Sequence, residues 1–263
     1  MDKRFRLRHP PITPQRLSYV FTALVLDLLL LSGRASTIDL MNRSLFSHRS
    51  LVAFALPVFA SAVCIALVVA RWFYAQVPDY GFMIWNLFLA WIPFVMAFIA
   101  YRLHRTRKRW GFLIAGCALI WLLFLPNAPY MLTDLVHLRY RDDTLIWYDL
   151  LLLLWFAWTG FMLGFGSIYL MQGVVTDLLG AFAGWTLAIG SIGLTSFGIY
   201  LGRFLRWNSW DVLRNPTALF ADIYYRFRHP IAHFHTHVFW LMLALFLVCV
   251  YVMLATLPAL RQR

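Results

Sequence analysis

The chain contains no glutamate, and all eleven of its acidic residues are aspartate. This absence excludes every site that needs a glutamate side chain, including the His-Glu-x-x-His zinc-protease motif. Charged residues make up only 13% of the 263 positions, about half the share found in soluble globular proteins. Apolar residues make up 62%, against roughly 45–50% in soluble proteins. The composition therefore excludes an ordinary water-soluble domain.

Cysteine is also scarce, with Cys64, Cys117 and Cys249 each lying inside an apolar segment. Their positions show neither the paired spacing of a disulfide framework nor that of a metal site. We interpret all three as small buried apolar residues. No residue is assigned to a metal, and the sequence identifies no cofactor.

The apolar residues are concentrated in segments long enough to cross a bilayer, which takes about 20 helical residues. Six such segments are expected: 51–70, 82–101, 111–125, 145–172, 178–201 and 238–257. The sequence therefore predicts an all-α, polytopic transmembrane helix bundle with about six membrane spans.

The net charge of +12 comes from arginines and lysines gathered at the ends of these apolar segments. Positive-inside sorting and anionic lipid headgroups explain this placement, so we exclude nucleic acid as a partner. The expected partners are the lipid bilayer, anionic headgroups and other membrane proteins. The basic block 102–109 and the basic C-terminus predict that both termini are cytoplasmic. Residues 202–237 would then lie outside, which conflicts with their five arginines.

Two regions are expected along the chain. Residues 1–40 form a basic N-terminal extension, interpreted as an interfacial helix or a poorly ordered segment, because Asp27 interrupts its apolar part. Residues 41–263 form the integral-membrane helical domain.

Small residues recur at steps of three and four along the fourth and fifth predicted spans. They include Gly160 and Gly164 on the fourth, and Gly184 and Gly198 on the fifth. Such spacing lets helices approach closely in lipid, so we predict that it serves helix packing. A stripe lining a substrate path is the alternative.

The most informative stretch is 121–149, WLLFLPNAPYMLTDLVHLRYRDDTLIWYD. Pro126 and Pro129 each remove a backbone donor, so the third span must stop or break there. Thr133 is the expected N-cap of a new short helix. On that helix the spacing places Asp134, His137 and Arg141 on one face.

This broken helix end presents an amide, a carboxylate and an imidazole beside the membrane surface. Asn127, Asp134 and His137 are the candidate catalytic residues, since an aspartate and a histidine can perform general acid–base chemistry. In the alternative interpretation the same side chains only satisfy backbone groups of an interfacial turn. The candidate substrate-binding residues are Tyr130, Arg141, Asp149, Arg203, Arg206, Asn208 and Asp211.

The last four of these residues belong to a second polar segment, 202–237. Arg206 and Trp210 would share a helical face, and Arg203 would join them if the helix continues beyond the lipid. An arginine pair beside tryptophans suits phosphate or carboxylate headgroups, although ordinary interfacial anchoring explains the pattern equally well. Histidines at 229, 233, 235 and 237 follow; without nearby cysteine or glutamate, we interpret them as a titratable interfacial patch.

Three motifs carry a resemblance to a known family: LPNAPYMLTDLVHL, WYDLLLLLWFAWTGFMLGFGSIYL and YLGRFLRWNSWDVL. They resemble an uncharacterised bacterial integral-membrane family, domain of unknown function 1361, over about residues 51–257. The resemblance implies a multi-pass protein of the bacterial inner membrane and brings no activity, cofactor or substrate with it.

The sequence thus leaves the biochemical function unassigned, with a candidate polar site at the outer-face end of the third span. One alternative is a membrane-embedded enzyme acting on a lipid-linked or headgroup substrate. The other is a non-catalytic scaffold or assembly factor for envelope proteins. A transporter is disfavoured, because no internal repeat or mid-membrane charge is visible.

Overall fold

The computed structural model describes residues 48–75, 79–106, 111–138 and 146–260, and in this part of the chain every regular element is a helix. The helices of the first half are α3 (His48–Ala75), α4 (Gly81–Arg105), α5 (Gly111–Phe124), α6 (Asn127–Tyr130) and the 3-10 helix η1 (Met131–His137). Those of the second half are α7 (Ile146–Leu179), α8 (Ala181–Leu205), α9 (Asp211–Arg214), α10 (Pro216–Arg228) and α11 (Phe234–Leu260).

Six segments are long and apolar enough to cross a membrane: Phe54–Tyr74, Gly81–Arg105, Gly111–His137, Ile146–Leu179, Ala181–Leu205 and Phe234–Thr256. This confirms the prediction of an all-α bundle with six spans. The predicted division between residues 1–40 and 41–263 falls outside the described residues.

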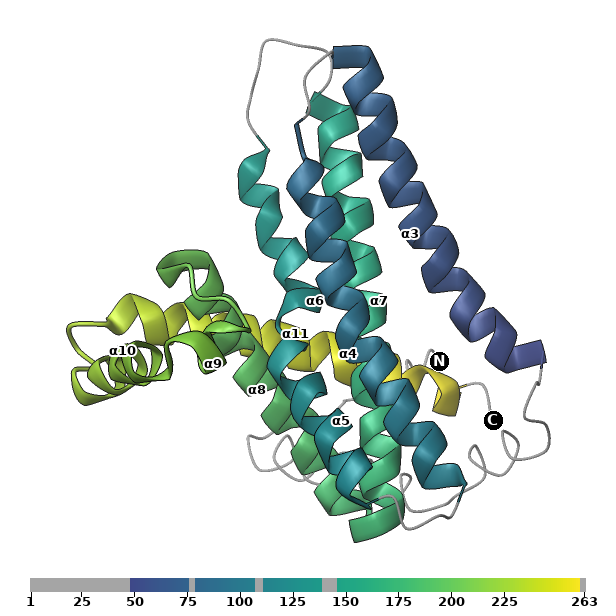
Figure 1. The fold of residues 1–263 in the computed structure, drawn as a ribbon, viewed down its shortest axis with the longest axis vertical. Helices are drawn as coiled ribbons and strands as arrows, with labels where there is room; N and C mark the ends of the chain where they lie inside the picture. Colours follow the sequence, from purple (N-terminus) through teal and green to yellow (C-terminus); the bar gives the residue numbers. More distant parts are fainter. Residues whose placement is uncertain (1–47, 76–78, 107–110, 139–145, 261–263) are drawn as a thin grey trace, which may run out of the picture.

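Helix α7 is the centre of the bundle (Figure 1). It packs against α3, α4, α6, η1 and α8, and its residues enter both large apolar clusters. Leu152, Phe156 and Leu163 face the cluster built with α3, α4 and η1, whereas Phe161 and Ile168 face the one built with α5, α8 and α11. A helix that is apolar on all sides is expected in such a central position.

The third span is broken at Pro126, as predicted, whereas Pro129 lies inside α6. The last bond of its first part joins the Leu125 amide to the Trp121 carbonyl at 2.9 Å, and α6 begins after Pro126. The expected N-cap was wrong: Thr133 lies inside η1, and its hydroxyl donates to the Tyr130 carbonyl at 2.7 Å. The chain turns directly from α6 into η1, so no separate cap is needed.

Glycines of α7 and α8 make room for this break. A Cβ built on Gly160 would lie 2.2 Å from the Ala128 carbonyl oxygen, and one on Gly164 would lie 3.3 Å from the Ala128 Cβ. On α8, a Cβ on Gly198 would lie 2.7 Å from Pro126. The small residues therefore serve close packing, here against the broken segment as well as between helices.

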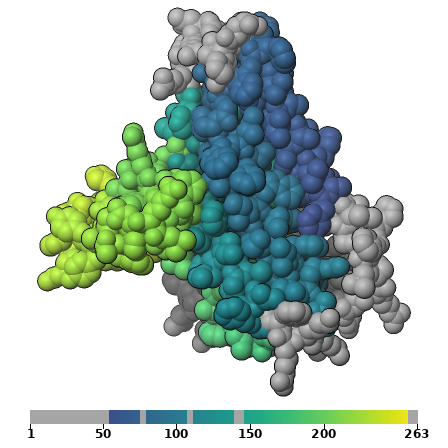
Figure 2. All heavy atoms as spheres, viewed as in Figure 1, coloured from purple at the N-terminus to yellow at the C-terminus, as the bar shows by residue number. Residues whose placement is uncertain are grey.

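Helix α8 ends at Leu205, where Arg206 adopts a left-handed conformation with φ 61°. The amides of Arg206 and Trp207 both turn back to the Leu201 carbonyl. The expected continuation of the helix, with Arg206 and Trp210 on one face, was therefore wrong. Beyond this turn α9 and α10 stand out from one side of the bundle (Figure 2), and α11 returns obliquely across α8 (Figure 1).

Candidate functional site

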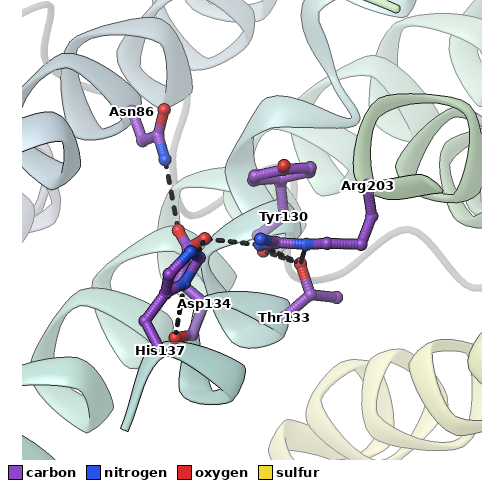
Figure 3. Close-up of polar contacts among 6 residues, drawn as sticks. All are labelled: Asn86, Tyr130, Thr133, Asp134, His137 and Arg203. Atoms are coloured by element: carbon purple, nitrogen blue, oxygen red, sulfur yellow. Dashed lines mark hydrogen bonds and ion pairs between the residues drawn. The ribbon is translucent and has the colours of Figure 1, made fainter. Parts of the chain in front are cut away.

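A buried carboxylate joins three separate elements (Figure 3). Asp134 of η1 is only 1% exposed. One of its oxygens accepts a hydrogen bond from Asn86 Nδ2 of α4 at 3.1 Å, and the other binds Arg203 Nη2 of α8 in a short ion pair. A buried charge must be paired and hydrogen-bonded to be tolerated, and here both oxygens are satisfied.

The guanidinium of Arg203 is fixed on two further sides. Its Nε and Nη2 both donate to Thr133 Oγ1, at 3.0 Å and 2.6 Å. Its Cζ lies 4.4 Å from the centroid of the Tyr130 ring, within cation–π range. The planar group thus joins α8 to both short helices that follow the break.

His137 lies three residues after Asp134, one turn further along the 3-10 helix η1. Its Nδ1 is 3.2 Å from the Asp134 backbone carbonyl and 3.6 Å from the carboxylate, and its ring lies against Phe82 at 5.0 Å between centroids. A proton on Nδ1 would be held by these acceptors, which leaves Nε2 as the free ring nitrogen. The spacing of Asp134 and His137 in the sequence predicted this proximity.

A second set of hydrogen bonds connects the break in the third span to Ser209, in the segment after α8. Asn127 Nδ2 donates both to the Phe124 carbonyl, which the break leaves free, and to Ser209 Oγ, each at 3.0 Å. Ser209 Oγ in turn donates to the Leu123 carbonyl at 3.0 Å. The backbone groups released by the prolines thus find partners in protein, as irregular backbone near lipid requires.

The turn after α8 is held by two carboxylates. Asp211 accepts hydrogen bonds from the Asn208 amide at 2.7 Å and from Asn208 Nδ2 at 3.3 Å. Asp222 of α10 accepts one from Trp207 Nε1 at 2.9 Å. These bonds fix the turn between α8 and α10.

A cavity of about 810 Å³ lies between the two polar segments. Its walls come from α4, α5, the break, α8 and the segment 206–220. The predicted site residues that line it are Asn127, Tyr130, Asp134, His137, Arg203, Arg206 and Asn208. The structure therefore brings seven of the ten candidates to one cavity.

Large apolar side chains form the rim of this cavity. Trp85 of α4, Leu119 of α5 and Leu194 of α8 are 56%, 70% and 58% exposed, and all three belong to membrane-spanning segments. Side chains exposed at such positions face acyl chains. We therefore expect this apolar rim to face lipid.

Asp149 is placed elsewhere. It forms a buried ion pair with Arg71 of α3, through Nε at 2.7 Å and Nη2 at 3.3 Å, and accepts a hydrogen bond from the Tyr80 hydroxyl at 3.1 Å. Burial, followed by the Asp149 charge and this hydrogen bond, raises the pKa of Tyr80 to about 12. Asp149 thus connects α3, α4 and α7 and does not line the cavity.

Asp211 also lies outside the cavity, where it accepts hydrogen bonds from Asn208 and holds the turn. Arg141 falls outside the described residues. The histidines after α10 pack against aromatic rings, His229 and His233 against Tyr225. Within the described ranges, no group of three or more metal-ligating side chains is close enough to hold an ion.

Sequence reasoning missed Asn86, Thr133 and Ser209 as partners in the network. Asn86 gave a usable signal, because a lone amide inside an apolar span needs a hydrogen-bond partner in lipid. Arg71 directly follows the first predicted span, 51–70, as a basic flanking residue would, yet it is 3% exposed and paired with Asp149.

A family described as "Protein of unknown function (DUF1361)" matches residues 85–253. The chain belongs to this family. No curated protein and no solved structure matches the chain. The DUF1361 region contains Asn86, Asp134 and Arg203, whereas Arg71 and Tyr80 lie before it. In this chain the cavity network thus lies within the matched region, and the Arg71–Asp149 pair connects that region to the preceding helix α3.

Proposed function

We propose that this protein binds a membrane amphiphile in the cavity between α4, the broken third span and α8. The observation that carries the proposal is the cavity itself, which has polar groups at one end and a lipid-exposed apolar rim at the other. Its volume of about 810 Å³ lies within the usual range of ligand pockets. We place the protein in the bacterial inner membrane on the basis of the sequence resemblance and the basic residues flanking its spans.

The arrangement of the rim supports an amphiphile over a water-soluble ligand. Leu119 and Leu194 sit within spans, so a ligand that reaches them exchanges contacts with acyl chains for contacts with protein. Its polar part would meet Asn127, Asn208 and His137 at the other end. Ligand pockets are usually apolar, with a small number of polar groups that fix the orientation of the ligand.

The Asp134–Arg203 network gives the site a rigid frame. Both carboxylate oxygens are occupied, so Asp134 acts in this proposal as a positioning residue and not as a base. A site supported in this way keeps its shape when empty. This favours binding, because fewer side chains have to lose conformational entropy when the ligand binds.

The test compares two tryptophan substitutions on α8. Leu194→Trp enlarges a side chain that lines the cavity, whereas Ile189→Trp enlarges an exposed one on the same helix that does not line it. Delipidated protein would be incubated with dioctanoyl phospholipids, and bound lipid counted by native mass spectrometry. We expect the wild type and I189W to retain lipid, and L194W to lose most of it. Equal retention by the two variants would overturn the proposal.

A second candidate function is an enzyme acting on the same amphiphile. His137 favours it, because its ring lines the cavity and is oriented through Nδ1 by the backbone and carboxylate of Asp134. An imidazole held in this way suits general acid–base chemistry. Its test is conversion of bound lipid in membranes. His137→Gln should abolish conversion but retain lipid binding, because glutamine keeps a polar contact for the headgroup and cannot transfer a proton. The scaffold alternative stays a prediction from the sequence.

A further inference from the structure

Arg206 differs from every other charged residue of the cavity in having no protein partner. Among the described residues its side chain makes no hydrogen bond, ion pair or ring contact, although it lines the cavity. Its neighbour Arg203 is occupied by Asp134, Thr133 and Tyr130. Of the two arginines among the described lining residues, Arg206 is therefore the one with a guanidinium available for a ligand.

The backbone at Arg206 adds a second observation. This residue ends α8 in the left-handed region, where glycine is the residue usually found after a helix. A side chain in that conformation costs stability relative to glycine. The left-handed turn places the Arg206 side chain at the cavity and off the helical row of Arg203.

The charges around the cavity leave it positive. Asp134 is its only carboxylate among the described lining residues, and Arg203 neutralises it. The nearby Asp211 and Asp222 do not line the cavity and accept hydrogen bonds from Asn208 and Trp207. Among the described aspartate, lysine and arginine residues of the lining, this leaves the charge of Arg206 without a counter-ion.

We propose that the amphiphile is an anionic lipid and that Arg206 binds its acidic headgroup. This inference rests on the proposed function and names the ligand class. Arginine recognises phosphate and carboxylate through two parallel N–H donors, and such charge-assisted bonds are about twice as strong as neutral ones. Asn208, which also lines the cavity beside Arg206, supplies a neutral polar contact for the same headgroup.

The apolar walls favour a lipid as the source of the anion over a free ion. Phe82, Trp85 and Leu89 of α4 face the cavity opposite Leu194 and Leu201 of α8. A bare phosphate would contact none of this surface. An acyl chain would bury it at about 25 cal/mol per Å² of apolar area.

The experiment compares Arg206→Gln with Arg214→Gln in the full-length protein. Arg214 lies on α9, is exposed and does not line the cavity, so it controls for the loss of one positive charge in the same segment. The probes are dioctanoyl phosphatidate, dioctanoyl phosphatidylcholine and inorganic phosphate, with affinities measured by native mass spectrometry or calorimetry in a neutral detergent.

We expect R206Q to weaken phosphatidate binding about tenfold or more and to change phosphatidylcholine binding less than about twofold, because one charge-assisted contact is lost. R214Q should leave both affinities unchanged. Equal weakening by R206Q and R214Q, or none by R206Q, would overturn the inference while leaving an amphiphile site intact. Phosphate binding as tight as phosphatidate binding would overturn the lipid assignment. Failure of the wild type to bind either lipid would instead contradict the proposed function.

Discussion

Arg203 and Asp134 lie 69 positions apart in the chain and form a buried ion pair that fixes the end of α8 against the broken third span. The carboxylate is 1% exposed and the arginine side chain 16% exposed. In such surroundings the pair is held by its extra hydrogen bonds to Asn86 and Thr133 as much as by charge.

Removing one partner of this pair should be strongly destabilising. Asp134→Asn leaves the Arg203 charge buried without its counter-ion, a loss of about 3–5 kcal/mol in comparable pairs. Thermal unfolding in detergent, followed by circular dichroism, would measure it. Asp177→Asn is the matched control, because Asp177 pairs with His104 and Arg105 at a more open site, where such pairs contribute about 0–1 kcal/mol. Similar melting temperatures for the two variants would contradict a structural role for the buried pair.

Adding one methyl group to α7 should test how tightly this helix packs against α6, the short helix that follows the break. Gly160→Ala places a Cβ against the Ala128 carbonyl, so α7 and α6 must separate, and overpacking of this kind costs about 1–3 kcal/mol. Gly173→Ala on the same helix meets no atom within 4 Å and should be neutral or stabilising, because alanine favours helix. The unfolding midpoint should fall for G160A and stay unchanged or rise for G173A. A G160A protein as stable as G173A would contradict the close contact between Gly160 and Ala128.

The triad of buried Arg71 and Asp149 with half-buried Tyr80 predicts that stability depends on pH at the alkaline end. Tyr80 holds its proton more tightly in the folded state, with a pKa raised from 10.0 to about 12. The corresponding stability is fully present below pH 10 and is lost as the pH rises toward 12. The wild type should therefore lose stability over this interval more steeply than Tyr80→Phe.

The phenylalanine variant should also be less stable than the wild type at neutral pH, because the hydrogen bond from the hydroxyl to Asp149 is gone. Tyr74→Phe, which removes an exposed hydroxyl at the end of α3, should retain the wild-type pH dependence. If Y80F followed the wild-type curve between pH 10 and 12, the titration would belong to another group.

Local chemistry explains which features could be predicted from the sequence. Pro126 and Pro129 act on their own backbone, so the break was visible without knowing the fold. The proximity of Asp134 and His137 likewise followed from their spacing of three. The glycines spaced three and four residues apart indicated that another part of the chain approaches α7 and α8 closely, because a residue without a side chain leaves room for such an approach. They did not identify Pro126 and Ala128 as the groups approached.

The partners across the bundle could not be predicted, because they depend on how helices distant in the chain are arranged. Arg203 looked like an interfacial cation until α8 was placed beside η1. Arg71 resembled an ordinary basic residue flanking the first span, because a basic residue after an apolar segment usually marks the membrane surface. The end of α8 at Arg206 was missed because an arginine carries no sign of a left-handed conformation, which is usually marked by glycine.

The contact between the two polar segments predicts a shared side of the membrane. Asp134 binds both Asn86, near the start of α4, and Arg203, near the end of α8, so these ends lie together. Arg105 closes the opposite end of α4, beside the basic residues that mark the cytoplasm. Residues 202–237 are therefore expected on the outer face despite their arginines.

Cysteine labelling in intact cells would measure this arrangement, in a background without the three native cysteines. Val136→Cys and Arg214→Cys introduce thiols at exposed positions of the two polar segments, and Thr106→Cys introduces one beyond the other end of α4. An impermeant maleimide should label the first two and reach the third only after the membrane is permeabilised. Labelling of V136C without R214C would mean that the segments face opposite sides, and both the Asp134–Arg203 pair and the cavity between them would then be untenable.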